Sequence, residues 1–148
     1  NGTLTTAMSS YRAYHQTSVQ TSDQLTLIVM LYDGMLRYLR KAHTCIEVQD
    51  IEGAHNYLMR SKDIVNELLS TLRVEKSGEV GGNLRDLYLY MFRRILEANL
   101  NKDPQPVQDV LRIAGTLRQG WLQIKSQRSQ HKQATLAQQK RAKFREQG

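Results

Sequence analysis

The sequence predicts an all-α fold, an antiparallel up-down helical bundle of four main helices with an irregular N-terminal arm and a basic C-terminal tail. In four successive segments the apolar residues recur at intervals of three and four, as they do along one face of a helix. Short breaks separate the segments, so neighbouring helices should run antiparallel. No segment shows the period-two alternation of a strand. With 148 residues, 40% of them hydrophobic, the chain can form one domain with a core.

We expect residues 1–23 to form the irregular arm, because they are rich in Ser, Thr, Asn and Gly. If Met8 is the natural start, residues 1–7 are a cloning remnant. Tyrosine side chains rarely stay in water when an apolar surface lies nearby, so we expect the arm to cover part of an apolar groove as a movable lid. The larger side chains of the arm are Tyr11, Tyr14 and Val19.

The first two helices are predicted from their caps and their apolar stripes. Thr21 or Ser22 can cap the first helix, and Asp50 can cap the second. The core stripe of the first helix is Leu25, Ile28, Tyr32, Met35, Leu39, Ala42 and Ile46. The inner side of the second helix holds Ile51, Ala54, Leu58, Val65, Leu68 and Leu72.

The third and fourth helices complete a bundle domain that we expect over residues 24–128. A glycine-rich turn is expected at residues 77–82, and Asn83 should begin the third helix. Prolines at the start of the fourth helix suit its first turn. Residues 129–148 form the basic tail, which is either a helical extension or disordered. The stripes are Leu84, Tyr88, Met91, Ile95 and Ala98, then Val107, Val110, Ala114, Leu117, Trp121 and Ile124.

The first and third helices carry more apolar surface than one core stripe needs. A second stripe lies beside the core stripe of the first helix, Met30 interrupts the polar side of that helix, and the third helix repeats the pattern. Contiguous exposed apolar surface usually marks a partner site. The alternative is that both helices are central and each wide stripe packs against two neighbours. The candidate partner-binding residues are Leu27, Met30, Leu31, Tyr38, Leu89, Phe92 and Leu96.

Patterns that would indicate catalysis or metal binding are missing from the sequence. Cys45 is the only cysteine, and on a helix His43 would point to a different face. The glycines near residue 80 lack the spacing of a phosphate-binding loop. We therefore expect no enzyme activity, no catalytic residue, no metal and no cofactor. No histidine has another His or Cys three or four positions away among His15, His43, His55 and His131.

The net charge of +7 is concentrated at the C-terminus. Residues 126–148 contain six basic side chains and one acidic side chain, so the rest of the chain is nearly balanced. A basic tail can hold polyanions through charge alone. The alternative function is therefore a nucleic-acid-binding or self-associating helical bundle that uses the tail. Nucleic acid is the less favoured partner because the bundle has no recognisable reading motif.

Two further expectations concern location and a pair of arginines. The longest apolar run, residues 27–32, is far shorter than the roughly 20 residues of a membrane span. The first residues lack the layout of a secretory signal, so the expected location is the cytoplasm. Arg93 and Arg94 point about 100° apart on a helix. We expect one of them to pair with Glu97 or Asp86 while its stem covers apolar surface.

Three stretches resemble the flagellin-specific export chaperone family known as FliS. The first contains Tyr11-Arg-Ala-Tyr14 and Met30-Leu-Tyr-Asp-Gly34. The second runs from Asn83-Leu-Arg-Asp through Arg93-Arg94 to Glu97-Ala-Asn99, and the third is Leu117-Arg-Gln-Gly-Trp121. The resemblance covers the chain from about Tyr11 to Ile124. The Met-Leu-Tyr-Asp-Gly and Arg-Arg…Glu-Ala-Asn runs are specific together and not singly, and the tail departs from the family pattern.

The resemblance implies a cytoplasmic export chaperone that binds the disordered C-terminal segment of flagellin. It also implies that the chain prevents premature polymerisation and aids delivery to the flagellar type III export apparatus. An export-gate protein, an anti-sigma factor and a co-chaperone are further partners that the family implies. Under this resemblance, the arm with Tyr11, Tyr14 and Val19 serves either as a lid or as a contact with the export gate.

Overall fold

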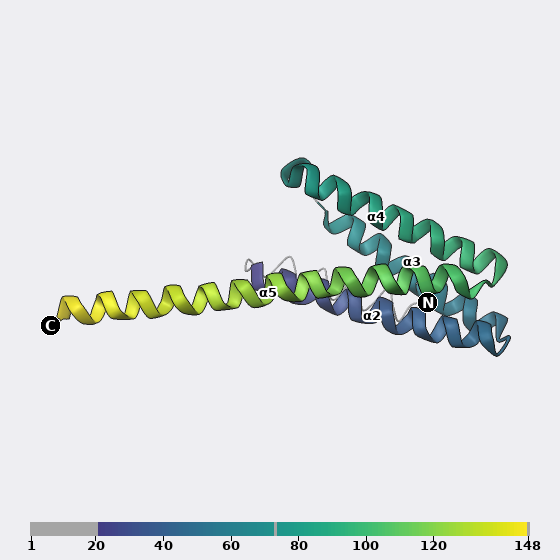
Figure 1. Cartoon of the computed structure of the whole chain (residues 1–148), viewed down its shortest axis with the longest axis horizontal. Helices are drawn as coiled ribbons and strands as arrows, with labels where there is room; N and C mark the ends of the chain where they lie inside the picture. The colour runs from purple at the N-terminus through teal and green to yellow at the C-terminus, as the bar shows by residue number, and fades with distance from the viewer. Residues whose placement is uncertain (1–20, 73, 148) are drawn as a thin grey trace.

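The computed structural model describes residues 21–72 and 74–147 and contains α-helices but no strand in those ranges. The helices are α2 (Thr21–Glu47), α3 (Ile51–Thr71), α4 (Val74–Asn101) and α5 (Pro104–Gln147). Figure 1 shows them running alternately up and down, with short connections between successive helices. The predicted all-α bundle is therefore confirmed.

The helices follow one another around the bundle in chain order. Helix α2 packs against α3 and α5, and α4 also packs against α3 and α5. Helices α2 and α4 therefore lie at opposite corners. In Figure 1, α4 is inclined to α5, and the two are closest near their connection at residues 102–103.

The core contains most of the stripes that the helical periodicity predicts. Ile51 and Ile124 were expected in those stripes, but they are 54% and 38% exposed. Ile51 is the first residue of α3, and Ile124 lies where α5 leaves the other helices (Figure 1). The largest fully buried side chains of the core come from all four helices, and Ser61, a buried polar residue, donates its hydroxyl to the Tyr57 carbonyl at 2.9 Å. Burying this apolar surface is the main force that holds the helices together. The large core side chains are Tyr32, Met35, Leu39, Leu58, Val65, Leu68, Tyr88, Met91, Ile95, Val107 and Val110.

The turn between α2 and α3 is tightly specified. Gln49 has a φ of 61°, the left-handed conformation that ends many helices. Asp50 accepts a hydrogen bond from the Gly53 amide at 3.0 Å, as a capping residue should. A Cβ on Gly53 would lie 2.3 Å from the Asp50 carboxylate and 2.9 Å from the Cys45 sulfur. A side chain at residue 53 would therefore have to displace Asp50 and Cys45 where α3 approaches the end of α2.

Helix α4 begins earlier than the sequence suggested. The glycine-rich segment was expected to be a turn before Asn83, but α4 starts at Val74. The break is confined to Gly78, whose φ of 63° and ψ of −135° are not helical. Glycine lowers helix stability by only about 1 kcal/mol relative to alanine, so Gly81 and Gly82 can be helical.

Helix α5 continues far beyond the bundle. It has 44 residues, which corresponds to about 66 Å at the rise of an α-helix. Its first half packs through Val107, Val110 and Ala114, whereas its second half projects away from the other helices (Figure 1). From residue 126 to residue 147 every side chain except that of Thr135 is exposed. Of the two alternatives left open for the tail, the structure has the helical extension.

Candidate partner-binding surface

The second apolar stripe of α2, which consists of Leu27, Leu31, Gly34, Tyr38 and Cys45, lies mainly against α3. A Cβ on Gly34 would lie 3.3 Å from the Ile64 side chain, which shows how closely the two helices approach there. Leu31 belongs to the core and is 6% exposed, and Leu27 is 9% exposed. The structure thus places Leu27 and Leu31 in the interior and not on a free surface. Periodicity could not show this, because it does not reveal which neighbour a stripe faces.

Two other candidates on α2 lie in different surroundings. Met30 is 43% exposed and is an accessible apolar side chain on the polar side of the helix. Tyr38 is half-buried, and its ring stacks on Tyr57 of α3. Tyr38 is therefore part of the α2–α3 contact. Of the candidates on α2, Met30 is the one whose side chain is accessible to a partner.

Helix α4 presents the longer accessible apolar line. Phe92 is half-buried and packs against the core, Leu89 is half-buried, and Leu96 is 41% exposed. Leu100, which the sequence reading missed, is 83% exposed and extends the line by one further turn. We call Leu89, Phe92, Leu96 and Leu100 the α4 line. Its spacing of three and four keeps all four side chains on one side of the helix.

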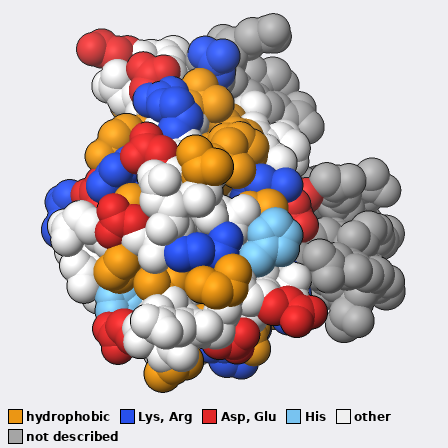
Figure 2. Space-filling model, turned by 90° about the vertical axis from the view of Figure 1, so that its right-hand side faces the viewer, with side chains coloured by type: hydrophobic (Ala, Val, Ile, Leu, Met, Phe, Trp, Pro, Cys, Tyr) orange, Lys and Arg blue, Asp and Glu red, His pale blue; other side chains and the backbone are white. Residues whose placement is uncertain are grey.

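The end of the bundle near the α2–α3 turn and the α4–α5 connection has further exposed apolar side chains. Val48 is 69% exposed and Ile51 is 54% exposed, and both flank the turn that follows α2. Figure 2 shows apolar side chains on this end, interspersed with charged ones. Helical periodicity could not indicate Val48, because this residue lies outside any helical stripe.

Arg94 has the structural ion pair that was expected for one of the two arginines. Its guanidinium donates to Glu97 at 2.6 Å and to Asp109 of α5 at 3.1 Å, whereas Arg93 is exposed. The expected partner Glu97 is confirmed. Asp109 was missed, because an ion pair between helices depends on their register and not on spacing within one helix.

Asp109 accepts hydrogen bonds from side chains of both α4 and α5. It accepts a hydrogen bond from the Tyr90 hydroxyl at 2.6 Å, and its other oxygen accepts one from Arg112. These hydrogen bonds, with the one from Arg94, hold the pKa of Asp109 below its usual value despite its partial burial. The carboxylate therefore fixes the edge of α4 next to its apolar line.

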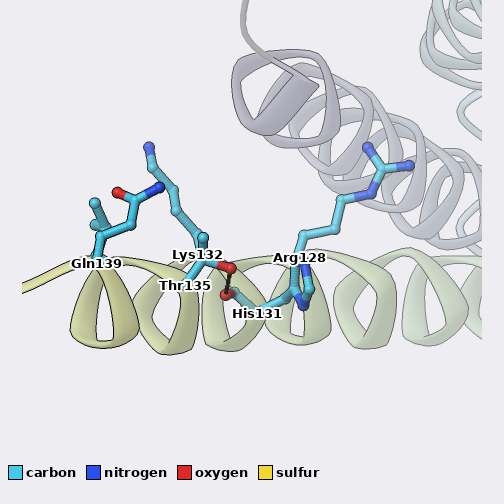
Figure 3. Close-up of a pocket in the computed structure, with 6 residues that line it drawn as sticks. Arg128, His131, Lys132, Thr135 and Gln139 are labelled. Atoms are coloured by element: carbon cyan, nitrogen blue, oxygen red, sulfur yellow. Dashed lines mark hydrogen bonds between the residues drawn. The ribbon is translucent and has the colours of Figure 1, made fainter. Parts of the chain in front are cut away.

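The projecting part of α5 offers a different kind of surface. Figure 3 shows an open hollow beside it, where the Thr135 hydroxyl donates to the His131 carbonyl at 3.0 Å. Its described lining comes from α5 alone and includes one large apolar side chain, Leu136. The hollow is therefore unlike the α4 line in chemistry. Its lining residues are Arg128, His131, Lys132, Thr135, Leu136 and Gln139.

Other kinds of site find little support in the described ranges. No group of three or more His, Cys, Asp and Glu side chains is arranged to hold a metal ion there. No helix in residues 21–72 or 74–147 is long and apolar enough to cross a membrane. Burial and the neighbouring Asp50 carboxylate raise the pKa of the Cys45 thiol, which disfavours the reactive thiolate. The arm candidates Tyr11, Tyr14 and Val19 lie outside the described residues.

Comparison with known proteins identifies the family. The family described as "Flagellar protein FliS" matches residues 7–128 of the chain. The flagellar secretion chaperone FliS of Bacillus subtilis is 34% identical over 119 residues, which cover 80% of this chain and 88% of that protein. The protein of the same name from Salmonella typhimurium is 36% identical over 121 residues, with 78% and 90% covered. That from Campylobacter jejuni is 32% identical over 129 residues, with 87% and 96% covered. The chain, an all-helical bundle throughout the matched part that the structure describes, therefore belongs to the FliS family of flagellar proteins.

Proposed function

We propose that this chain is a cytoplasmic flagellar export chaperone that binds the disordered C-terminal segment of flagellin. By holding that segment it would prevent premature polymerisation and aid delivery to the flagellar type III export apparatus. The FliS relatives are named as secretion chaperones, and the family is not one of enzymes, in agreement with the expectation of no catalysis. The structural observation that carries the proposal is the α4 line, with Leu96 and Leu100 exposed.

The α4 line suits a client segment that becomes helical on binding. An amphipathic helix docks through anchors spaced by three and four residues, and the α4 line has complementary spacing. Burying one apolar side chain fully contributes about 1.5–3 kcal/mol. Ordering a disordered client offsets much of that gain. Many modest contacts of this kind give a complex that can also release its client.

A client that also uses Met30 has to pass around the bundle. Met30 lies on α2 and Leu96 on α4, and these two helices occupy opposite corners. One straight helix cannot touch both side chains. A disordered segment can wrap a large surface, so both positions are compatible with a single flexible client.

The arm with Tyr11, Tyr14 and Val19 is proposed to regulate access to the client surface. A lid lowers the apparent affinity for the client by the fraction of time for which the surface is open. If the two tyrosines contribute about 2 kcal/mol of closing energy, the surface is open a few per cent of the time. A chain starting at Thr21 should then bind flagellin more than about tenfold more tightly. Unchanged or weaker binding would instead leave the arm as a direct client contact or a contact for the export gate.

Calorimetry with the isolated C-terminal segment of flagellin tests the central proposal. Leu96→Glu should weaken binding by about tenfold or more, because it removes an apolar anchor and buries a charge. Leu136→Glu is the matched control, since it makes the same change at a similarly exposed leucine on the projecting part of α5. Equal affinities for the two variants would count against the α4 line. No binding by the wild-type chain would remove the proposal itself. An anti-sigma factor or a co-chaperone is proposed as a further partner of the chain.

Nucleic-acid binding or self-association through the tail remains the second candidate function. The observation in its favour is that residues 126–147 form an exposed helix that carries most of the net positive charge. Heparin retention that disappears on removal of residues 129–148 would favour nucleic-acid binding only if the chain also failed to bind flagellin. A chain that self-associates without any client would favour a self-associating bundle.

A further inference from the structure

A cluster of tyrosines and cations lies at the contact between α2 and α3. The rings of Tyr38 and Tyr57 stack with their centroids 6.1 Å apart and an interplanar angle of 27°. Both side chains are half-buried, so they can contribute to packing and to the surface together. The stacked pair joins the two helices across their seam.

Three cations surround these two rings. The Arg37 guanidinium lies 5.5 Å from the Tyr38 centroid, and the Lys41 ammonium lies 5.5 Å from the Tyr57 centroid. Arg60 lies 5.7 Å from each of the two centroids. The negative faces of the rings attract the cations and hold them over a small area. We call these five residues the cation–tyrosine cluster.

The positive charge of the cluster is not neutralised by the residues that the structure describes. Arg37, Lys41 and Arg60 make no ion pair with a described carboxylate. In contrast, Arg94 pairs with Glu97 and Asp109, and Arg118 pairs with Asp33. Cations gathered at this spacing repel one another. The rings offset part of that repulsion, but an anionic partner would offset more. The cluster is therefore a local concentration of positive potential on the α2–α3 side of the bundle.

We propose that the cation–tyrosine cluster is a docking site for an acidic segment of a partner protein. Arg37 and Lys41 are one helical turn apart on α2, and Arg60 faces them from α3. Carboxylates two residues apart on an extended chain are separated by about 7 Å, and those one turn apart on a helix by about 5–6 Å. Either arrangement can place successive carboxylates opposite these cations. The two guanidinium groups add bidentate hydrogen bonding to the charge attraction.

The chemistry of the cluster favours an acidic peptide over nucleic acid. Single-stranded nucleic acid binds largely by stacking bases on aromatic faces. In the cluster the two rings stack on each other, and the cations lie over them, so their faces are already occupied. A carboxylate needs no free ring face, because it pairs with the cations directly. The site thus suits a partner recognised by its acidic side chains.

The cluster is separate from the α4 line, which is the surface that carries the flagellin proposal. None of its residues lies on α4, and Tyr38 is turned toward α3, where it stacks on Tyr57. A substitution in the cluster can therefore be scored independently of Leu96. Failure of the docking proposal would leave the flagellin proposal unchanged, and the converse also holds.

Fluorescence anisotropy with a labelled peptide of alternating glutamate and serine, titrated with the full chain at low salt, tests the proposal. The triple variant Arg37→Gln/Lys41→Gln/Arg60→Gln should bind the peptide about fivefold more weakly or worse, because three surface charge contacts are lost. The matched control is Arg85→Gln/Arg93→Gln/Lys140→Gln, which removes the same net charge from exposed positions elsewhere. This control should retain nearly wild-type affinity.

Three results would overturn the docking site. They are no binding by the wild-type chain, an equal loss in both triple variants, and tighter binding of an oligo-deoxythymidine that is lost in the cluster variant. The last result would assign the cluster to nucleic acid. Circular dichroism checks that the triple variants keep wild-type helical content. If the cluster variant loses helicity, the single exposed change Lys41→Gln replaces it, and unchanged peptide affinity in that variant would also reject the site.

Discussion

The hydroxyl groups of Tyr32 on α2 and Tyr88 on α4 lie 2.6 Å apart in the middle of the bundle. The two side chains are 0% and 1% exposed, and their rings are tilted by 47°. Burial raises the pKa of Tyr32 to about 12 and raises that of Tyr88 further, so both are neutral at ordinary pH. One hydroxyl donates and the other accepts. The pair therefore links the two helices at opposite corners through the core and favours one register between them.

Removing one hydroxyl of this pair should cost more than removing both. Tyr88→Phe leaves the buried Tyr32 hydroxyl without this partner, which should lower the free energy of unfolding by about 1–3 kcal/mol. The double variant Tyr32→Phe/Tyr88→Phe leaves neither group unsatisfied and should be closer to wild type. Urea denaturation of the four proteins in a double-mutant cycle measures the coupling. Strictly additive losses would show that the hydroxyls act independently.

The stability of the bundle should depend on pH through Asp109. Its folded-state pKa is lowered, so its contribution is fully present above the usual carboxylate value of about 4. The contribution is lost as the pH falls through the lower folded-state pKa. Asp109→Asn should therefore reduce the loss of unfolding free energy between about pH 6 and pH 3. The same acid-induced loss in wild type and variant would show that other carboxylates account for it.

A side chain at residue 53 should destabilise the α2–α3 turn. Gly53→Ala would displace the Asp50 carboxylate from its capping position, so we expect a loss of about 1–2 kcal/mol in unfolding free energy. Gly115→Ala is the matched control, because a Cβ there meets nothing within 4 Å. Alanine at residue 115 should be neutral or raise stability by up to about 1 kcal/mol. Thermal denaturation followed by circular dichroism compares the two, and similar melting temperatures would contradict the steric argument.

Two adjacent residues on α2 should respond differently to the same substitution. Leu31 is 6% exposed and Met30 is 43% exposed. Leu31→Glu buries a charge in the core and should destabilise the bundle by about 3 kcal/mol or more. Met30→Glu should change stability by less than about 0.5 kcal/mol, because surface substitutions usually do. If the Leu31→Glu protein were stable and fully helical, Leu31 would not be a core residue and would again be a candidate for partner binding.

The sequence could predict the parts of the structure that depend on local pattern. The core stripes of α2 and α4 and the Asp50 cap follow from helical spacing and capping chemistry, and the structure contains them. The second stripe of α2 could not be assigned in the same way. Whether it faces a neighbour or solvent depends on how α3 lies against it, and the close approach at Gly34 is a feature of the tertiary structure. Gly34 itself was the one local sign of that approach, since a glycine in a helix interior often marks close packing.

The interactions between helices could not be predicted from the sequence either. Asp109 pairs with Arg94 across fifteen positions, and Tyr57 stacks on Tyr38 across the α2–α3 seam. Both contacts depend on the relative register of helices, which periodicity within one helix does not determine. On α4, Leu89, Phe92 and Leu96 lie on a side that the neighbouring helices only partly cover, and their role as partner contacts stays a prediction.

The continuity of α5 from Pro104 to Gln147 affects how the tail folds. A helix that packs against nothing is only weakly stable in water, because starting a helix costs far more than lengthening one and most helix stability in proteins comes from packing. The packed half of α5 supplies that start, so residues 126–147 need only propagate it. Because its side chains are exposed, the tail makes almost no contacts that would stabilise the bundle. The tail should therefore melt when the bundle melts, yet its removal should leave the melting temperature of the bundle unchanged, so it adds about 30 Å of reach without adding stability.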